Sequence, residues 1–394
     1  MASLNRNRSQ HQDAGGIYIH FPFCVSRCDY CSFVSYIHDR AVAKRYIDTL
    51  KSELSLWAEL YGKDSNAGPK VFDSIYIGGG TPSIAEADDW NVILGFIHDR
   101  FQITPDAEIT IEANPGTFDS ARGRDWRSAG INRISLGAQS FVDSELRSMG
   151  RFHNSHDIIR SVNSLKQANF TNLSMDLLVG YPDQSIQSVG ESLGKVFLCD
   201  PCHVSVYLLE IKSGAAICES IRTGCLKLLD DDLSADMYEL VCDLMFRHGF
   251  EQYEISNFCR DSRRSVHNMK YWTDGFYLGV GAGAHGRLEN LRYSNYCAIE
   301  EYHACVEEGR YPWDTTINLD PHTRMIEALI MGLRLNRGVD LIGLSDRYSI
   351  DVGAYVMNRL STLNMYNLFE VDERTIRLTQ RGRLLSNVVF ERLL

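Results

Sequence analysis

Short apolar runs alternate with longer amphipathic runs from residue 16 to residue 209, and this alternation constrains the fold more than any other feature of the chain. The longer runs, such as 42–62, place apolar residues at helical spacing. Strands that alternate with helices form βαβ units and a parallel sheet, and strands covered on both faces are continuously apolar. We therefore predict an α/β fold built on six strands: GIYIH (16–20), VFDSIYIGG (71–79), AEITIEA (107–113), INRISLG (131–137), NLSMDLLVG (172–180) and HVSVYLL (203–209).

The predicted strands end in segments rich in glycine, proline and polar side chains. Parallel strands end on the same side of their sheet, and α/β barrels and open sheets bind ligands on that side. We therefore expect the segments that follow the strands to face one cavity. They are CVSRC (24–28), GGGTPS (78–83), EANPGT (112–117), GAQSF (137–141), DLLVGYP (176–182) and LLEIKSG (208–214).

The last part of the chain has a different pattern. A helix-like stretch at 321–339 is followed by two short strand-like runs, LFEVD (368–372) and TIRLT (375–379), and an amphipathic run closes the chain. Helices followed by a small hairpin are typical of a winged-helix-like α+β module. Such modules often bind DNA, but the acidic character of this chain favours a packing role.

Three cysteines, Cys24, Cys28 and Cys31, lie within eight residues. Soft thiolates select zinc or iron–sulfur clusters. A zinc site would need a fourth ligand, which His20 or the CDPC segment (199–202) could supply. Three thiolates on a four-iron cluster would instead leave one iron open to a small molecule. The residues alone leave both alternatives open.

Composition and charge exclude several classes of function. The formal net charge of −11 argues against a protein that coats duplex nucleic acid, which needs a basic face. The first sixteen residues lack the apolar core of a signal peptide, and no run of eighteen apolar residues occurs, so we expect neither export nor membrane insertion. Eleven cysteines without an export signal indicate free thiols in a reducing cytoplasm.

The cysteine loop resembles that of the radical S-adenosylmethionine (SAM) superfamily. The segment YIHFPFCVSRCDYC (18–31) contains the superfamily signature C-x3-C-x-(aromatic)-C, with Tyr30 as the aromatic residue. The resemblance implies a partial (β/α)6 TIM-type barrel and one [4Fe–4S] cluster on Cys24, Cys28 and Cys31. It also implies that the open iron binds SAM, which one electron splits into methionine and a 5′-deoxyadenosyl radical.

Residues at the predicted strand ends match positions that face SAM in this superfamily. The segment GGGTPS lacks the Lys-Ser/Thr pair of a phosphate loop, and its glycines allow close approach of backbone and ligand. Each polar residue alone could be a strand-end group with a structural hydrogen bond, but together they match the family in order. The resemblance implies a SAM site formed by Tyr18, Tyr30, Gly79, Gly80, Thr81, Glu112, Gln139, Arg151 and Asp176.

From residue 16 to residue 394 the chain resembles the oxygen-independent coproporphyrinogen III oxidase family, which has two branches. The decarboxylating, HemN-like branch has a fourth cysteine where this chain has Phe33, and a longer segment before the cluster loop. Both departures favour the haem chaperone, HemW-like branch, whose members bind haem and pass it to acceptor proteins. The resemblance divides the chain into a disordered tail (1–15), a barrel with the cluster and SAM (16–290) and a HemN-type C-terminal domain (291–394).

The segment HNMKYW (267–272) matches the H-N-x-x-Y-W segment of the haem chaperone branch. Histidine can ligate iron, and tyrosine and tryptophan offer flat apolar surfaces to a macrocycle. The same residues could instead cap and pack local structure, and Cys259 and His285 are alternative contacts for haem. The branch resemblance favours haem. The predicted haem residues are His267, Asn268, Tyr271 and Trp272.

A second glycine-rich segment, GVGAGAHG (279–286), contains the G-x-G-x-x-G pattern of dinucleotide-binding sites. The pattern is significant only where a helix opens at its last glycine, and the residues after Gly286 do not have a helical pattern. We therefore expect a loop near the mouth of the barrel rather than a dinucleotide site.

The resemblance predicts that haem or a porphyrin is the ligand and that a haem-acceptor protein is a partner, with an electron donor as a further partner. One alternative is oxidative decarboxylation of the propionates of coproporphyrinogen III. A radical methyltransferase with a second SAM and a structural zinc protein without SAM are more distant alternatives.

Overall fold

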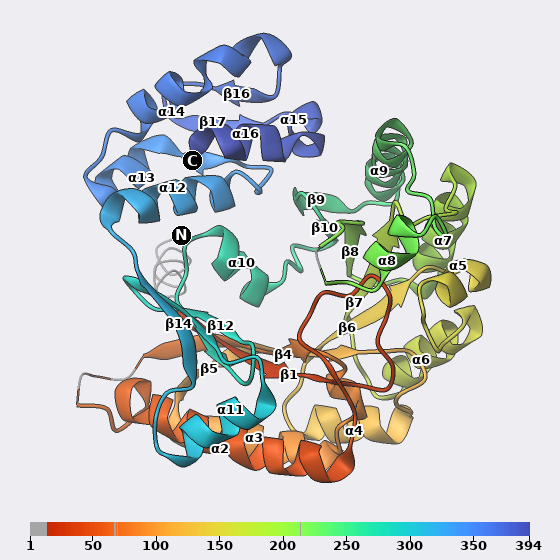
Figure 1. The fold of residues 1–394 in the computed structure, drawn as a ribbon, viewed down its shortest axis with the longest axis vertical. Helices are drawn as coiled ribbons and strands as arrows, with labels where there is room; N and C mark the ends of the chain where they lie inside the picture. Colours follow the sequence, from red (N-terminus) through yellow and green to blue (C-terminus); the bar gives the residue numbers. More distant parts are fainter. Residues whose placement is uncertain (1–13, 67, 69, 213) are drawn as a thin grey trace.

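The computed structural model describes residues 14–394 except residues 67, 69 and 213, and it shows a large curved sheet beside a smaller C-terminal unit (Figure 1). The sheet has twelve strands in the order β14-β13-β12-β11-β1-β4-β5-β6-β7-β8-β10-β9. Six neighbouring strands are parallel, and they confirm the six strands expected from the apolar runs. They are β1 (Gly15–Phe21), β4 (Val71–Gly79), β5 (Gln102–Ala113), β6 (Arg133–Gln139), β7 (Asn172–Val179) and β8 (His203–Leu208).

Helices connect the parallel strands and cover the outer face of the sheet (Figure 1). Their ends follow from capping residues: Asp39 accepts the first free N–H groups of α2, and Ser185 forms a capping box at the start of α7. Trp57, Trp90 and Trp126 are fully buried between these helices and the sheet. The helices are α2 (Arg40–Tyr61), η1 (Pro82–Ile84), α3 (Ala87–Arg100), α4 (Ser120–Ser128), α5 (Asp143–Ser148), α6 (Ser155–Gln167), α7 (Ile186–Cys199), α8 (Ile217–Arg222) and α9 (Asp231–Arg247).

Additional strands extend both sides of the parallel core. Beside β8 the chain adds two antiparallel strands, and beside β1 it adds the parallel strand β11 followed by three antiparallel strands. Strands β14 and β9 form the two edges of the sheet, so the parallel strands make a partial barrel, as predicted. The added strands are β9 (Glu251–Glu254), β10 (Asn257–Cys259), β11 (Tyr277–Val280), β12 (His285–Arg287), β13 (Leu291–Asn295) and β14 (Trp313–Asn318).

The C-terminal unit has its own apolar core, which includes Met325, Val352 and Val389. A three-stranded antiparallel sheet in the order β15-β17-β16 lies against its helices. This arrangement of helices and a small hairpin confirms the α+β, winged-helix-like prediction. Its elements are α12 (Pro321–Gly332), β15 (Val339–Asp340), α13 (Leu341–Tyr348), α14 (Val352–Leu360), η2 (Ser361–Tyr366), β16 (Phe369–Val371), β17 (Thr375–Leu378), α15 (Gln380–Leu384) and α16 (Ser386–Leu393).

The boundary between the two cores lies later in the chain than residue 290. Tyr293, Tyr302 and Trp313, carried by β13, α11 (Ile299–Glu307) and β14, pack in the core of the barrel. These elements stay with the barrel because β13 and β14 continue its sheet and α11 packs against α2. The cores therefore separate near residue 318. Strand β1 already begins at Gly15, whereas the rest of the predicted tail, residues 1–13, lies outside the described residues.

A short helix, α10 (Val266–Trp272), lies between the sheet and the C-terminal unit (Figure 1). It packs against β1 and β4 on one side and against α12 on the other. Ser265 caps its start by accepting the N–H of Asn268. Within the described part of the chain, no helix has the length and apolar character needed to cross a membrane.

Candidate functional site

The loop that follows β1 carries Cys24, Cys28 and Cys31. Two short paired strands, β2 (Phe23–Cys24) and β3 (Tyr36–Ile37), close the base of this loop. A turn within it brings the N–H of Cys31 to 3.2 Å from the carbonyl oxygen of Cys28. All three thiols are free and partly exposed. The loop thus presents three sulfur donors at the carboxyl end of the first parallel strand.

Two side chains from other strand ends hold the thiols. The Thr81 hydroxyl donates to Sγ of Cys24 at 3.5 Å, and Nη1 of Arg151 donates to Sγ of Cys28 at 3.2 Å. Burial raises the pKa of the Cys24 thiol, and the hydrogen bond from Thr81 partly offsets this rise. Burial opposes the charge of Arg151, but Tyr30 and Cys28 raise the pKa of its guanidinium. A permanent cation therefore lies beside the sulfur donors, where it favours negative charge on them.

Asn114 connects these two side chains. Its Nδ2 donates to the Thr81 hydroxyl at 3.0 Å, and its Oδ1 accepts a hydrogen bond from Nη2 of Arg151 at 2.6 Å. Arg151 also donates to the carbonyl oxygen of Gly137 at 2.9 Å. Asn114 was not among the predicted site residues, although its position in the Asn-Pro turn after β5 was a signal.

The donor set fits an iron–sulfur cluster better than a single zinc ion. Among the described residues, no three His, Cys, Asp or Glu side chains are arranged to hold one metal ion. His20 cannot complete a zinc site as placed, because its ring nitrogens contact the Tyr18 hydroxyl at 3.0 Å and the Val34 carbonyl oxygen at 3.1 Å. Cys202 donates to Oδ1 of Asn172, and Cys199 is buried at the end of α7. Three soft donors without a fourth ligand match a larger cluster with one open iron.

Gly79 and Gly80 bring the end of β4 against the cysteine loop. Gly79 has a φ of +110°, and a Cβ added there would lie 2.5 Å from the His20 ring. A Cβ on Gly80 would lie 2.6 Å from the carbonyl oxygen of Phe23. Both distances are too short for a side chain, so close packing of protein against protein is one reason for glycine at these positions.

Glu112 lies on β5 beside the end of β4. Its carboxylate accepts hydrogen bonds from the Tyr76 hydroxyl at 2.8 Å and from the N–H of Gly79 at 3.0 Å. Burial raises the pKa of Glu112 to about 7, and the two hydrogen bonds limit the rise. The carboxyl group can therefore change its charge near neutral pH. Tyr76 was not among the predicted site residues, because it lies within an apolar strand; its position next to the glycine-rich turn was the available signal.

The remaining predicted SAM residues lie around the same end of the barrel. Gln139 ends β6 in the left-handed conformation, with a φ of 65°. The rings of Tyr18 and Tyr76 stack with centroids 6.1 Å apart, and the ring of Tyr30 lies perpendicular to that of Tyr181. Asp176 lies deeper, in mid-strand β7, where burial raises its pKa.

His267 lies on the amino-terminal side of the predicted SAM residues, with its ring centroid 5.3 Å from that of Tyr76 and 6.2 Å from that of Tyr18. Its side chain is completely buried, with Nδ1 3.1 Å from the Ser74 hydroxyl and Nε2 3.0 Å from the Tyr271 hydroxyl. Burial, together with smaller effects of the nearby Lys270 and Arg133, lowers the pKa of His267 to about 3. The imidazole is therefore neutral, and both ring nitrogens have hydrogen-bond partners. The role of this segment in haem binding stays a prediction.

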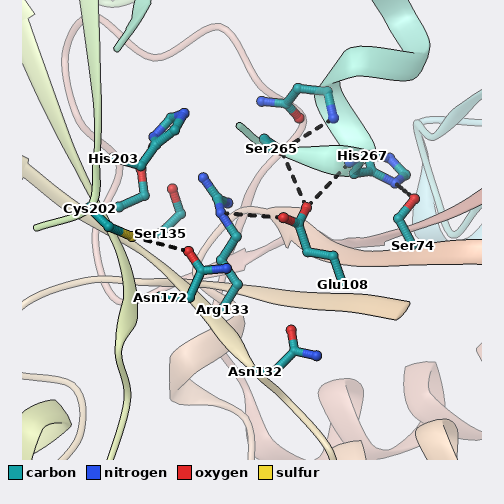
Figure 2. Close-up of polar contacts among 12 residues, drawn as sticks. Ser74, Glu108, Asn132, Arg133, Ser135, Asn172, Cys202, His203, Ser265 and His267 are labelled. Atoms are coloured by element: carbon teal, nitrogen blue, oxygen red, sulfur yellow. Dashed lines mark hydrogen bonds and ion pairs between the residues drawn. The ribbon is translucent and has the colours of Figure 1, made fainter. Parts of the chain in front are cut away.

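A network of buried polar side chains surrounds His267 (Figure 2). Glu108 accepts hydrogen bonds from the N–H of His267 at 3.3 Å and the Ser265 hydroxyl at 3.5 Å, and it lies 3.8 Å from Nε of Arg133. His203 joins the network through the Tyr253 hydroxyl, which lies 2.9 Å from its Nε2 and accepts a hydrogen bond from the N–H of Ser265 at 3.4 Å. The network could not be predicted from the sequence, because Glu108, Arg133 and Ser265 lie far apart along the chain.

The other haem alternatives have contrasting environments. Cys259 is completely buried on β10, whereas His285 is exposed at the start of β12. The residues after Gly286 continue into the strands β12 and β13, so no helix opens there. This confirms the prediction that no helix opens at Gly286, so the segment lacks the strand–turn–helix geometry of a dinucleotide fingerprint.

Comparison with protein families agrees with the cysteine loop and the partial barrel. Residues 18–196 match the radical SAM superfamily, and residues 319–385 match the HemN C-terminal domain. The solved structure of coproporphyrinogen III oxidase (HemN) from Escherichia coli superposes with a TM-score of 0.85 over 97% of this chain and 90% of that chain, at 22% identity. The protein is thus a radical SAM protein with the HemN fold, and this class implies a [4Fe–4S] cluster and SAM.

Curated relatives identify the branch. The chain is 31% identical to heme chaperone HemW of Bacillus subtilis over 95% of this chain and 97% of that protein. It is also 31% identical to HemW of Lactococcus lactis over 97% and 98% of the two chains. Radical S-adenosyl methionine domain-containing protein 1 of Mus musculus, a mitochondrial protein, is 35% identical over 82% of this chain and 74% of that protein. The chain belongs to the HemN/HemW family, in the HemW branch.

Proposed function

We propose that this protein binds haem and delivers it to an acceptor protein. The observation that carries the proposal is the likeness to heme chaperones over nearly the full length of both chains. The HNMKYW segment on α10 and the exposed Phe33 in place of a fourth cysteine support the same branch. A reducing cytoplasm is the location that best suits the free thiols of the loop.

We assign the cluster to Cys24, Cys28 and Cys31, and SAM to the strand ends beside them. When bound, these groups supply one-electron chemistry. The residues beside the cluster and SAM act in different ways. Arg151 and Thr81 hold the thiols and favour their negative charge. Glu112, with a pKa of about 7, holds or releases a proton next to Gly79.

The geometry of α10 adds a condition to haem binding by His267. Because both ring nitrogens contact hydroxyl groups, the imidazole must leave at least one of them before it can ligate iron. Its complete burial means that α10 must also shift away from β4 or α12. We therefore propose that haem binding at His267 is coupled to movement of α10.

Haem titration of the anaerobically purified protein tests the proposal. We expect a saturable Soret band, and transfer of the bound haem to apomyoglobin when that acceptor is added. His267→Ala should weaken binding, whereas His322→Ala, on the exposed start of α12, should not. A wild-type protein that shows no saturable haem binding would contradict the proposal.

The second candidate is coproporphyrinogen III decarboxylation, which the close match to the HemN fold favours. Phe33 opposes it, because a side chain with 63% exposure and no thiol occupies the position of the fourth cysteine. The assay is carbon dioxide release from coproporphyrinogen III with SAM and a strong reductant. Release at a rate that depends on Cys28 would establish the oxidase and displace the chaperone proposal.

A further inference from the structure

Six charged side chains form one connected network where the barrel meets the C-terminal unit. Asp274, two residues after α10, pairs with Arg287 of the barrel. From the C-terminal unit, Nη2 of Arg347 lies 2.8 Å and Nη2 of Arg324 lies 3.8 Å from the same carboxylate. Glu327 on α12 joins the network through Arg292 at 2.6 Å and Arg287 at 3.8 Å. We call these residues the junction network.

The junction network carries more positive than negative charge. Four guanidinium groups face two carboxylates, which leaves a formal excess of two positive charges. The carboxylate of Asp274 is only 2% exposed, whereas the side chains of Arg292 and Arg347 are 40% and 47% exposed. Nε of Arg324 is buried without a hydrogen-bond partner among the residues described. The network can therefore accept further anionic groups from the solvent side.

Tyr277, which is close to Arg287 and Arg292, connects the junction network to the predicted haem segment, and a further arginine outside the network contacts Trp272. The rings of Tyr271 and Tyr277 pack edge to face with centroids 4.8 Å apart, and Arg287 and Arg292 partly offset the rise in the pKa of Tyr277 that burial causes. On the other side of α10, the guanidinium of Arg334 lies 4.5 Å from the centre of the Trp272 ring. Cationic and flat apolar groups thus meet at one end of α10.

We propose that the junction network binds the two propionate carboxylates of haem, an inference that rests on the proposed function. Haem is a flat apolar ring with two carboxylates on one edge. The two uncompensated positive charges equal the two carboxylates in number and are opposite to them in sign, and guanidinium groups bind carboxylates in a defined bidentate geometry. Tyr271 and Trp272 then lie beside the apolar part of the ligand. The same contacts link haem to α12 and α13 of the C-terminal unit.

A purely structural role for the junction network makes a different prediction. A network that only fastens the two cores needs no excess of charge, and its arginines would affect thermal stability but not the charge preference of the ligand. Esterification of the propionates removes both negative charges and leaves the macrocycle unchanged. Comparison of haem with its dimethyl ester therefore separates binding of carboxylates from binding of the ring.

The experiment measures binding of iron protoporphyrin IX and of its dimethyl ester to the full-length, cluster-loaded protein in the same detergent. We expect Arg347→Gln and Arg292→Gln each to weaken haem binding about tenfold and to leave binding of the ester unchanged. Glu327→Gln removes a negative charge and should strengthen haem binding, so one variant shifts affinity in the opposite direction. Arg377→Gln is the matched control, because Arg377 is exposed and pairs with Glu370 on β16.

The results distinguish failure of the proposed propionate site from failure of the proposed haem-binding function. Wild-type binding of haem with unchanged affinity in the arginine variants would overturn the junction site and leave the proposed function intact. Equal losses for haem and ester would also overturn it, because they indicate disturbed folding rather than a lost carboxylate contact. A wild-type protein that binds neither ligand would overturn the proposed function together with this inference.

Discussion

The Tyr271 hydroxyl lies 3.0 Å from Nε2 of His267, one helical turn earlier on α10. Residues four apart on a helix face the same side, so the helix itself holds the two groups together. Ser74 of β4 contacts the other ring nitrogen at 3.1 Å. A neutral imidazole has one N–H and one lone pair, and this arrangement occupies both. Any iron ligation by His267 therefore competes with hydrogen bonds inside the protein.

Because the hydrogen bond from Tyr271 competes with iron for His267, we expect removal of the Tyr271 hydroxyl to increase haem binding. Tyr271→Phe keeps the ring but removes the hydroxyl that contacts Nε2, so we expect several-fold tighter or faster haem binding, measured from the Soret band. Tyr277→Phe is the matched control, because this ring touches Tyr271 without contacting His267. Weaker binding by the Tyr271 variant would indicate that the hydroxyl contacts haem directly.

The pKa of Glu112 predicts a dependence of stability on pH. Burial raises this pKa to about 7 from an ordinary value of 4.5, so the folded state holds the proton more tightly than the unfolded state. The stability that this group contributes is complete below pH 4.5 and is lost as the pH rises through about 7. Glu112→Gln removes this dependence while it keeps the size of the side chain. Urea unfolding from pH 5 to pH 8 should show the variant gaining stability relative to the wild type.

SAM binding supplies a second readout for Glu112. SAM carries a positive sulfonium, which an ionised carboxylate attracts and a neutral one does not. We expect the affinity of the cluster-loaded wild-type protein for SAM to rise between pH 6 and pH 8, and the affinity of the Gln variant to change less. Parallel pH profiles for the two proteins would remove Glu112 from the SAM site.

The three thiols of the loop should hold the cluster as a unit. Cys28→Ala removes the sulfur that Arg151 contacts, and we expect iron and labile sulfide to fall to background after anaerobic reconstitution. The control is Cys225→Ala, because Cys225 is an exposed free thiol elsewhere in the chain. Retention of full iron and sulfide by the Cys28 variant would show that the cluster uses other ligands.

Gly79 should tolerate no side chain. A methyl group there meets the His20 ring at 2.5 Å in a left-handed backbone conformation, so Gly79→Ala should destabilise the protein by about 1–3 kcal/mol. Gly95→Ala provides a control of opposite sign, because Gly95 lies in α3 with no atom near the added methyl group. Alanine in a helix should stabilise by about 0.5–1 kcal/mol. Thermal unfolding measures both effects. A melting temperature of the Gly79→Ala variant equal to that of the wild type would contradict the steric argument.

Local patterns predicted most of the fold and the cysteine loop. Strands β4 and β7 could be predicted because their apolar runs reflect burial on both faces, a property of each strand by itself. The cysteines lie within one turn-rich loop, so their proximity needs no long-range contact. By contrast, the burial of His267 depends on Ser74 and Glu108, which are far away in sequence. No pattern within HNMKYW predicts those contacts.

The same reasoning explains the error at the domain boundary. Strands β13 and β14 follow the boundary at residue 290 that the family resemblance implied, but their side chains complete the apolar core of the barrel. The junction network was missed for a related reason. Arg324 and Arg347 lie at positions where solvated arginines are common, and only the folded chain brings them to Asp274.

The position of α10 between two cores has a consequence for truncation. A chain cut after residue 318 would keep the whole sheet but lose α12, the helix that covers α10. Trp272 would lose the guanidinium of Arg334, and Asp274 would lose the guanidinium groups of Arg324 and Arg347 and the hydroxyl of Tyr348. A protease should then reach the α10 segment readily. We therefore expect excision of the radical SAM barrel to destabilise α10 even though the barrel keeps its own apolar core.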